Sequence, residues 1–260
     1  MLFDLDGVLL DTEPLYSQAT QAVLNAYGKR FEWSLKREMI GRSDIESAEL
    51  LVSRLELPIS AREYLALYEP ELDALFVQAP PMPGAEELVA ALDSRGVPIA
   101  VGTSSRQRLF QLKSKPHAWF SRFSTVVCGD DPAVKAFKPA PDIFLTAAAR
   151  LNVAARDCVV IEDSPSGVMA ARRAGMRVIA LPAPELEPGA LGDADLIVQS
   201  HAEVRAALFS ALERVWSLRS ARHVEPAEER AEGGSLGGRH ELEVATAIDD
   251  FPEILGGDGF

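Results

Sequence analysis

Two carboxylates stand near the start of the chain, where an apolar segment gives way to polar residues. The stretch from Met1 to Leu5 is short and largely apolar, as expected of a buried parallel strand, and it is followed by Asp6 and Gly7. Alternate residues of a strand point the same way, so Asp4 and Asp6 form a pair unless the chain turns between them, which Gly7 would permit. Close carboxylates repel each other and need a cation or a shared proton, and oxygen ligands suit Mg²⁺. The alternative is a strand end with two solvated acids.

A second acidic pair follows another apolar run. Glu162 and Asp163 come directly after Val159–Ile161, and Ser164 could cap a helix that begins there. Two acidic strand ends that meet around one point would form a magnesium site.

Two further loops carry groups that suit an anion. Thr103 and Ser104 follow an apolar run, and a hydroxyl with free amides at a helix start binds anions well. Thr103 could equally cap the next helix. Lys138 precedes two prolines in the turn Lys-Pro-Ala-Pro, which would hold its ammonium group in place to neutralise a phosphate and a carboxylate. The alternative is an exposed lysine, the usual case. Asp130 and Asp131 are expected to shape this loop.

The chain from residue 84 alternates between helical and strand patterns, which predicts an α/β fold: a Rossmann-like parallel sheet with helices on both faces. In such sheets ligands bind beyond the carboxyl ends of the strands. The predicted strands cover 98–103, 125–128, 158–162, 177–181 and 196–199. The predicted helices cover 85–94, 106–113, 141–151, 164–174 and 202–216.

Residues 14–79 differ, because they contain helical patterns and no convincing strand. The predicted helices cover 15–27, 34–40, 44–55 and 60–77, and Ser60 with Glu63 matches a capping box. A proline-rich joint follows. The sequence therefore predicts a catalytic core of residues 1–13 and 80–216, a small all-helical cap of residues 14–79, and an acidic, disordered tail of residues 217–260.

Composition excludes several classes of protein. A net charge of −13 argues against nucleic acid and anionic membranes as partners. There is no apolar run of about 18 residues and no secretory signal pattern. Cys128 and Cys158 lie in or beside strand-like runs and are expected to be reduced core thiols. We therefore expect a cytoplasmic protein. A monomer is the expected state, although the sequence does not specify the oligomeric state.

The four polar loops, in this order, resemble the haloacid dehalogenase-like hydrolase superfamily over residues 1–216. The segment Phe3–Glu13 is similar to its first motif, and the helical block lies where that family inserts its cap. The residues that match the second, third and fourth motifs are Thr103, Lys138 and the pair Glu162 and Asp163. The loop around Lys138 resembles the branch of capped phosphatases with pseudouridine-5'-phosphatase and glycerol-3-phosphatase. Phe137 departs from that pattern, since relatives usually have glycine there.

The resemblance implies roles for these residues. Asp4 would attack phosphorus and form an aspartyl-phosphate, and Asp6 would protonate the leaving alcohol and then deprotonate water. Mg²⁺ would be held by Asp4, the Asp6 carbonyl and Asp163, with Glu162 acting through a bound water. The transferring phosphoryl group would be held by the side chains of Thr103 and Lys138.

The expected function is therefore magnesium-dependent hydrolysis of a small phosphorylated metabolite: a sugar, nucleoside or polyol phosphate. Substrate choice would fall to cap residues, chiefly Glu13 and Arg42, although Arg42 is also typical of an exposed helix start. The other cap candidates are Tyr16, Gly41, Ser43 and Asp44. A sugar phosphomutase of the β-phosphoglucomutase type is the main alternative, although those relatives tend to have histidine where Tyr16 stands. A dehalogenase is disfavoured because it lacks the acid corresponding to Asp6. A non-catalytic binding protein with an interacting acidic tail is the third alternative.

Overall fold

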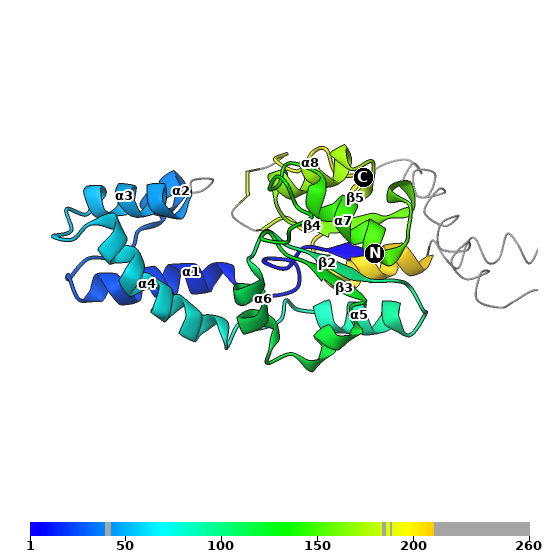
Figure 1. Cartoon of the computed structure of the whole chain (residues 1–260), viewed down its shortest axis with the longest axis horizontal. Coiled ribbons are helices and arrows are strands. Elements are labelled where there is room, and N and C mark those ends of the chain that lie inside the picture. Colours follow the sequence, from blue (N-terminus) through cyan, green and yellow to red (C-terminus); the bar gives the residue numbers. More distant parts are fainter. Residues whose placement is uncertain (40–42, 184–185, 188, 211–260) are drawn as a thin grey trace, which may run out of the picture. The chain divides into compact units, whose positions relative to one another are not determined.

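The computed structural model describes residues 1–39, 43–183, 186–187 and 189–210 (Figure 1). The last predicted helix, 202–216, is observed over residues 201–210. Its remainder and the predicted acidic tail from residue 217 lie outside the described residues, as do Gly41 and Arg42.

The chain folds into two compact units. The sheet unit contains residues 1–9, 81–107 and the described residues from Trp119 onward, and the helical unit contains the described residues of 10–80 and 108–118. The helical unit thus includes the predicted cap but also takes in residues 108–118, which sequence reasoning placed with the core.

The sheet unit is built on six parallel strands in the order β3-β2-β1-β4-β5-β6, which confirms the predicted α/β class. From β1 the chain adds β2 and β3 on one side and then β4 to β6 on the other. The direction of sheet growth therefore reverses next to β1, and such a switch point is where ligands bind. The strands are β1 (Leu2–Phe3), β2 (Ala100–Gly102), β3 (Thr125–Val127), β4 (Val159–Glu162), β5 (Arg177–Ala180) and β6 (Leu196–Ile197).

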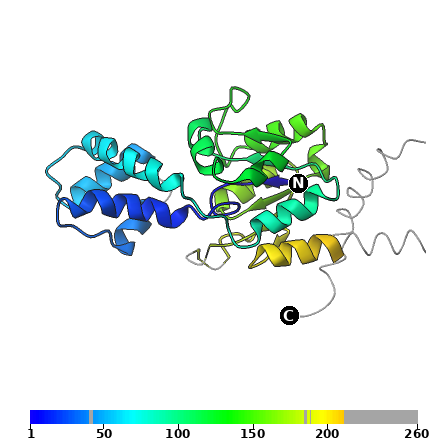
Figure 2. The ribbon, with the colours of Figure 1, turned by 90° about the horizontal axis from the view of Figure 1, so that it is seen from below.

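Helices cover both faces of this sheet, as alternating strands and helices require. The helices α7 and α8 lie on one face, and α5 and the helix over 201–210 lie on the other (Figures 1 and 2). The first face packs fully buried strand residues such as Val160 against Phe144 of α7. The bounds are α5 (Ala85–Asp93), α7 (Asp142–Leu151), α8 (Pro165–Arg173) and the 3₁₀ turns η1 (Ala118–Arg122) and η2 (Ala155–Asp157).

The helical unit has a core of its own. Leu24, Leu51 and Tyr64 are among the buried residues of a cluster formed entirely within residues 23–64. Ser60 accepts from the Glu63 amide, and Glu63 accepts from the Ser60 amide at 2.7 Å, which confirms the predicted capping box. The helices are α1 (Glu13–Asn25), α2 (Trp33–Met39), α3 (Asp44–Arg54), α4 (Ala61–Phe76) and α6 (Gln107–Ser114).

Two further features of the described residues are the state of the cysteines and the character of the helices. Cys128 and Cys158 are buried free cysteines, as predicted. Among the described residues, none of the helices combines the length and apolar character needed to cross a membrane.

Burial should decide the cost of leucine truncation in the helical unit. Leu51 is 0% exposed, whereas Leu67, also on a helix of this unit, is 47% exposed. We expect Leu51→Ala to lower the free energy of unfolding by about 2–5 kcal/mol, because it leaves a cavity. The control Leu67→Ala should change it by at most about 0.5 kcal/mol. Urea unfolding followed by circular dichroism measures both, and equal effects would contradict the assignment of Leu51 to a packed core.

Candidate active site

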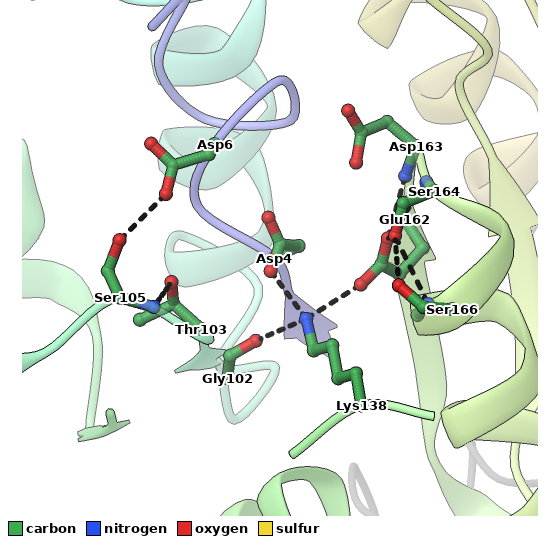
Figure 3. Close-up of polar contacts among 11 residues, drawn as sticks. Asp4, Asp6, Gly102, Thr103, Ser105, Lys138, Glu162, Asp163, Ser164 and Ser166 are labelled. Carbon is green, nitrogen blue, oxygen red and sulfur yellow. Dashed lines mark hydrogen bonds and ion pairs between the residues drawn. The ribbon is translucent and has the colours of Figure 1, made fainter. Parts of the chain in front are cut away.

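The predicted functional loops meet at the carboxyl edge of the sheet (Figure 3). Asp4 and Asp6 follow β1, Thr103 follows β2, and Asp163 follows β4. Lys138 reaches the same point from the loop between β3 and α7. Because β1 pairs in parallel with both β2 and β4, their carboxyl ends are neighbours at the switch point of the sheet.

Lys138 is the centre of the cluster. Its Nζ donates to Asp4 Oδ1 at 2.5 Å, to Glu162 Oε1 at 2.7 Å and to the Gly102 carbonyl at 3.0 Å. The ammonium therefore uses all three of its donors. The side chain is 5% exposed, so the alternative of a solvated lysine is wrong. Burial alone would lower the pKa of Lys138, but the two carboxylates raise it above its usual value, and the group stays charged.

Asp4 is a buried residue whose carboxyl group contacts this lysine. Its backbone amide donates to the Ile161 carbonyl at 3.0 Å, which ties the end of β1 to β4. Burial raises the pKa of the Asp4 carboxyl to about 7; Lys138 opposes this shift, and Glu162 and Asp6 add to it. The ammonium alone therefore does not offset the cost of burying this carboxylate, and further positive charge would stabilise its ionised form.

Asp6 faces a different partner. The chain turns after Asp4, and Gly7 adopts a φ of +81°, the left-handed region that favours glycine. The Asp6 carboxyl points to Ser105, whose Oγ donates to Asp6 Oδ2 at 2.8 Å (Figure 3). A side chain at Gly7 would also meet the Asp163 carboxyl. The bend at Leu5 thus separates the Asp4 and Asp6 side chains, and the turn at Gly7 brings the first loop against the fourth.

Glu162 and Asp163 have unlike surroundings. Glu162 is fully buried, and its Oε2 accepts from the amides of Asp163 and Ser164 at 3.0 and 3.1 Å and from the Ser164 hydroxyl at 3.0 Å. With Lys138 on Oε1, both oxygens are occupied by protein donors. These contacts fix Lys138 in place, and an approach of Glu162 to a metal through a bound water stays a prediction.

The Asp163 carboxyl, in contrast, accepts no hydrogen bond from the described residues. Burial raises its pKa well above the usual value, and repulsion from Glu162 and Asp4 adds to the shift. Asp163 is therefore a half-buried carboxylate that lacks a counter-charge of its own and lies close enough to Asp4 to repel it.

The donor set suits a hard cation. The carboxyl groups of Asp4 and Glu162 contact the Lys138 ammonium, and those of Asp6 and Asp163 lie close enough to Asp4 to repel it. Hard oxygen donors with excess negative charge are what Mg²⁺ selects. Within the described part of the chain, however, no three carboxylate, histidine or cysteine side chains form a ready-made metal cage. A metal here would combine the carboxylates of Asp4 and Asp163 with a main-chain oxygen, which is the set that the resemblance implies, and this set stays a prediction.

The second loop is held by its own hydroxyl. Thr103 is 1% exposed, and its Oγ1 accepts from the Ser105 amide at 3.0 Å. Since α6 begins only at Gln107, Thr103 does not cap that helix, and the capping alternative is wrong. Ser104 is exposed at the tip of the loop. Sequence reasoning missed Ser105, although its place in a run of three hydroxyl residues after a strand was a usable signal.

The loop before Lys138 is shaped as expected. Asp131 Oδ1 accepts from the Ala133 amide at 3.0 Å, and Asp130 Oδ1 accepts from the Gln107 amide at 2.8 Å. The backbone bond between Lys138 and Pro139 is cis.

Two of the predicted cap contacts, Glu13 and Tyr16, belong to the helical unit. Glu13 lies in the first turn of α1 in the helical unit and pairs with Lys36 at 2.7 Å. Tyr16 packs edge-on against Phe76 in the same unit. Arg42 lies outside the described residues, so a substrate role for Glu13 or Arg42 stays a prediction.

Comparisons of the sequence with known proteins identify relatives of the chain. Residues 1–181 match the family model described as haloacid dehalogenase-like hydrolase. The chain is 42% identical over 206 residues to (DL)-glycerol-3-phosphatase 2 of Arabidopsis thaliana, covering 77% of this chain and 86% of the relative. It is 41% identical over 212 residues to the probable pseudouridine-5'-phosphatase of Drosophila melanogaster, covering 80% and 92%.

A solved structure also has a similar fold. A HAD family hydrolase from Deinococcus radiodurans, crystallised with bound phosphate and sodium, superposes with a TM-score of 0.70 at 28% identity. The match covers 80% of this chain and 93% of that one. The resemblance found in the four loops is thereby confirmed, and the chain belongs to the haloacid dehalogenase-like hydrolase family.

Proposed function

We propose that the protein is a magnesium-dependent phosphatase that hydrolyses a small phosphate monoester, namely a sugar, nucleoside or polyol phosphate, through an aspartyl-phosphate. The observation that carries the proposal is the buried Lys138 bridging Asp4 and Glu162 at 2.5 and 2.7 Å. A cation in that position neutralises a transferring phosphoryl group beside a carboxylate nucleophile. The phosphatase names of the relatives in Arabidopsis and Drosophila support this class of substrate.

The first half-reaction transfers the phosphoryl group to the protein. An Asp4 carboxylate oxygen attacks phosphorus while the bond from phosphorus to the substrate oxygen breaks. Asp6 donates its proton to that oxygen, so that the alcohol leaves neutral. Lys138 supplies positive charge beside the phosphoryl oxygens, and the Thr103 hydroxyl donates to one of them, with Ser104 at the tip of the same loop.

The second half-reaction restores the enzyme. Asp6, now a carboxylate, takes a proton from a water molecule whose oxygen attacks phosphorus. The bond between phosphorus and Asp4 breaks, and inorganic phosphate leaves. Glu162 keeps Lys138 in place through both steps.

The residues that would hold Mg²⁺ are Asp4, Asp163 and the main-chain carbonyl of Asp6. Asp163 fits because its carboxyl has no donor among the described residues, and Asp4 fits because burial disfavours its charge. When bound, the ion supplies positive charge to the two carboxylates and to the phosphoryl oxygens.

Phosphate release from a panel of monoesters tests the proposal. With Mg²⁺ we expect turnover of at least one sugar, nucleoside or polyol phosphate, and with excess chelator we expect none until Mg²⁺ is restored. Products are followed as free phosphate and as sugar phosphate isomers. Full activity in chelator would remove the metal, and isomerisation without phosphate release would favour the mutase.

Asp4→Asn should lower kcat by about three orders of magnitude or more, because the amide cannot form the acyl-phosphate. The control Asp193→Asn changes an exposed aspartate and should leave kcat unaltered. Circular dichroism establishes that both variants are folded. Substantial phosphate release by folded Asp4→Asn would rule out Asp4 as nucleophile.

Lys138→Met should lower kcat/KM by about 100- to 1000-fold, as removal of one charge-stabilising donor does elsewhere. Lys135 offers a matched control in the same loop, since its side chain is exposed and donates to the nearby Pro132 carbonyl. Lys135→Met should stay within a few-fold of the wild-type rate. Similar losses in both variants would mean that Lys138 acts on the loop rather than on the phosphoryl group.

A further inference from the structure

Ser105 contacts Asp6, and the proposed reaction assigns Ser105 no role. Its Oγ donates to Asp6 Oδ2 at 2.8 Å, although 99 positions separate the two residues in the sequence. Figure 3 shows the Asp6 carboxyl turned toward Ser105 and the Asp4 carboxyl turned toward Lys138. The two acids of the first loop thus have separate partners, and the partner of Asp6 comes from the loop after β2.

The position of Ser105 is itself fixed by its backbone. Its amide donates to Thr103 Oγ1 at 3.0 Å, and its carbonyl accepts from the Gly129 amide at 3.0 Å. Two residues further on, the Gln107 amide donates to Asp130 at 2.8 Å. The loop after β2 is thereby held at both ends by groups of the sheet unit, so the Ser105 hydroxyl is presented from a fixed place.

Gly129 allows this support. A Cβ at this position would collide with the carbonyl of Ser104, so the backbone of the loop after β3 approaches the loop after β2 as closely as only glycine permits. The network therefore runs from the loop after β3, through Ser105, to the Asp6 carboxyl.

We propose that Ser105 is a positioning residue that orients the Asp6 carboxyl for proton transfer, an inference that rests on the proposed phosphatase function. A hydrogen bond to Oδ2 limits rotation of the carboxyl and so fixes the direction in which Oδ1 can exchange the proton. General acid catalysis depends on placing that oxygen within hydrogen-bond reach of the leaving oxygen.

The serine hydroxyl suits both half-reactions. In the first, the proton on Asp6 Oδ1 passes to the leaving oxygen, which keeps the electron pair of the broken bond to phosphorus. In the second, Oδ1 takes a proton from the attacking water. Oδ2 can accept from Ser105 throughout, whether Asp6 is protonated or ionised, and the Ser105 proton stays where it is.

A purely structural role for Ser105 would be to shape the phosphate-binding loop, and leaving-group dependence separates the two roles. An alkoxide is a poor leaving group that needs a proton, whereas p-nitrophenolate leaves without one. Loss of the acid's orientation must therefore slow alkyl phosphates selectively, while damage to the phosphate-binding loop must slow both substrates.

The experiment compares p-nitrophenyl phosphate with glycerol 3-phosphate, or with the fastest alkyl phosphate of the panel. We expect Ser105→Ala to lower kcat/KM about 10- to 100-fold for the alkyl phosphate, a part of the contribution typical of general acids. The loss for p-nitrophenyl phosphate should be at most about three-fold, since that leaving group needs no proton. Ser105→Thr should recover most of the lost rate, and Ser124→Ala, at an exposed serine of the same unit, should change neither substrate.

A double variant of Ser105 and Asp6 provides a second test of the proposal. In an Asp6→Asn background, Ser105→Ala should cause no further loss with the alkyl phosphate, because the two residues act as one unit. Equal losses on both substrates, no loss at all, a gain in rate, or fully additive effects with Asp6→Asn would each overturn the proposal.

Failure of the proposed function gives a different result. Wild-type protein would then release no phosphate from either substrate, and Asp4→Asn would change nothing. The inference about Ser105 can still be judged from crystal structures of the wild-type and Ser105→Ala proteins. A displaced Asp6 carboxyl in the variant supports it, and an unchanged one overturns it.

Discussion

The rest of this site depends on one buried ammonium group that lies between two buried carboxylates. Lys138 can stay charged at 5% exposure only because Asp4 and Glu162 supply opposite charge at hydrogen-bond distance. Removing either partner would leave an unpaired charge in a poorly solvated place. Two strand ends and the loop before α7 must therefore meet at one point, and the parallel pairing of β1 with β4 provides that meeting.

The acidic groups differ in their hydrogen-bond donors, and the roles proposed for them differ accordingly. Glu162 has four protein donors and acts as the fixed support of Lys138. Two of those donors are amides at the start of α8, where the exposed N–H groups of a helix favour a negative charge. Asp163 has no such donors among the described residues, and Asp6 accepts from the Ser105 hydroxyl. Adjacent acids in the sequence thus differ in surroundings, because Glu162 is bonded to Lys138 and to the start of α8, whereas the Asp163 carboxyl faces the first loop at Gly7.

The excess of carboxylates explains why a lysine alone does not complete the site. Burial raises the pKa of Asp4 to about 7 even with Lys138 in contact, and Asp163 is shifted in the same direction by burial and by its acidic neighbours. A divalent cation would reduce that repulsion and keep the nucleophile ionised. The proposed magnesium and the proposed nucleophile are therefore linked through one electrostatic imbalance.

The amino-acid sequence by itself determined the class of fold, the order of strands and helices, and which loops meet at the carboxyl edge of the sheet. These follow from local patterns: apolar runs, helical spacing, and acids or hydroxyls at strand ends. Only the tertiary structure decided that Asp6 turns from Asp4 to Ser105, that Glu162 supports Lys138, and that residues 108–118 join the helical unit. A polar side chain finds its partner through strand order and loop path, which link residues up to 134 positions apart, and no local pattern encodes that choice.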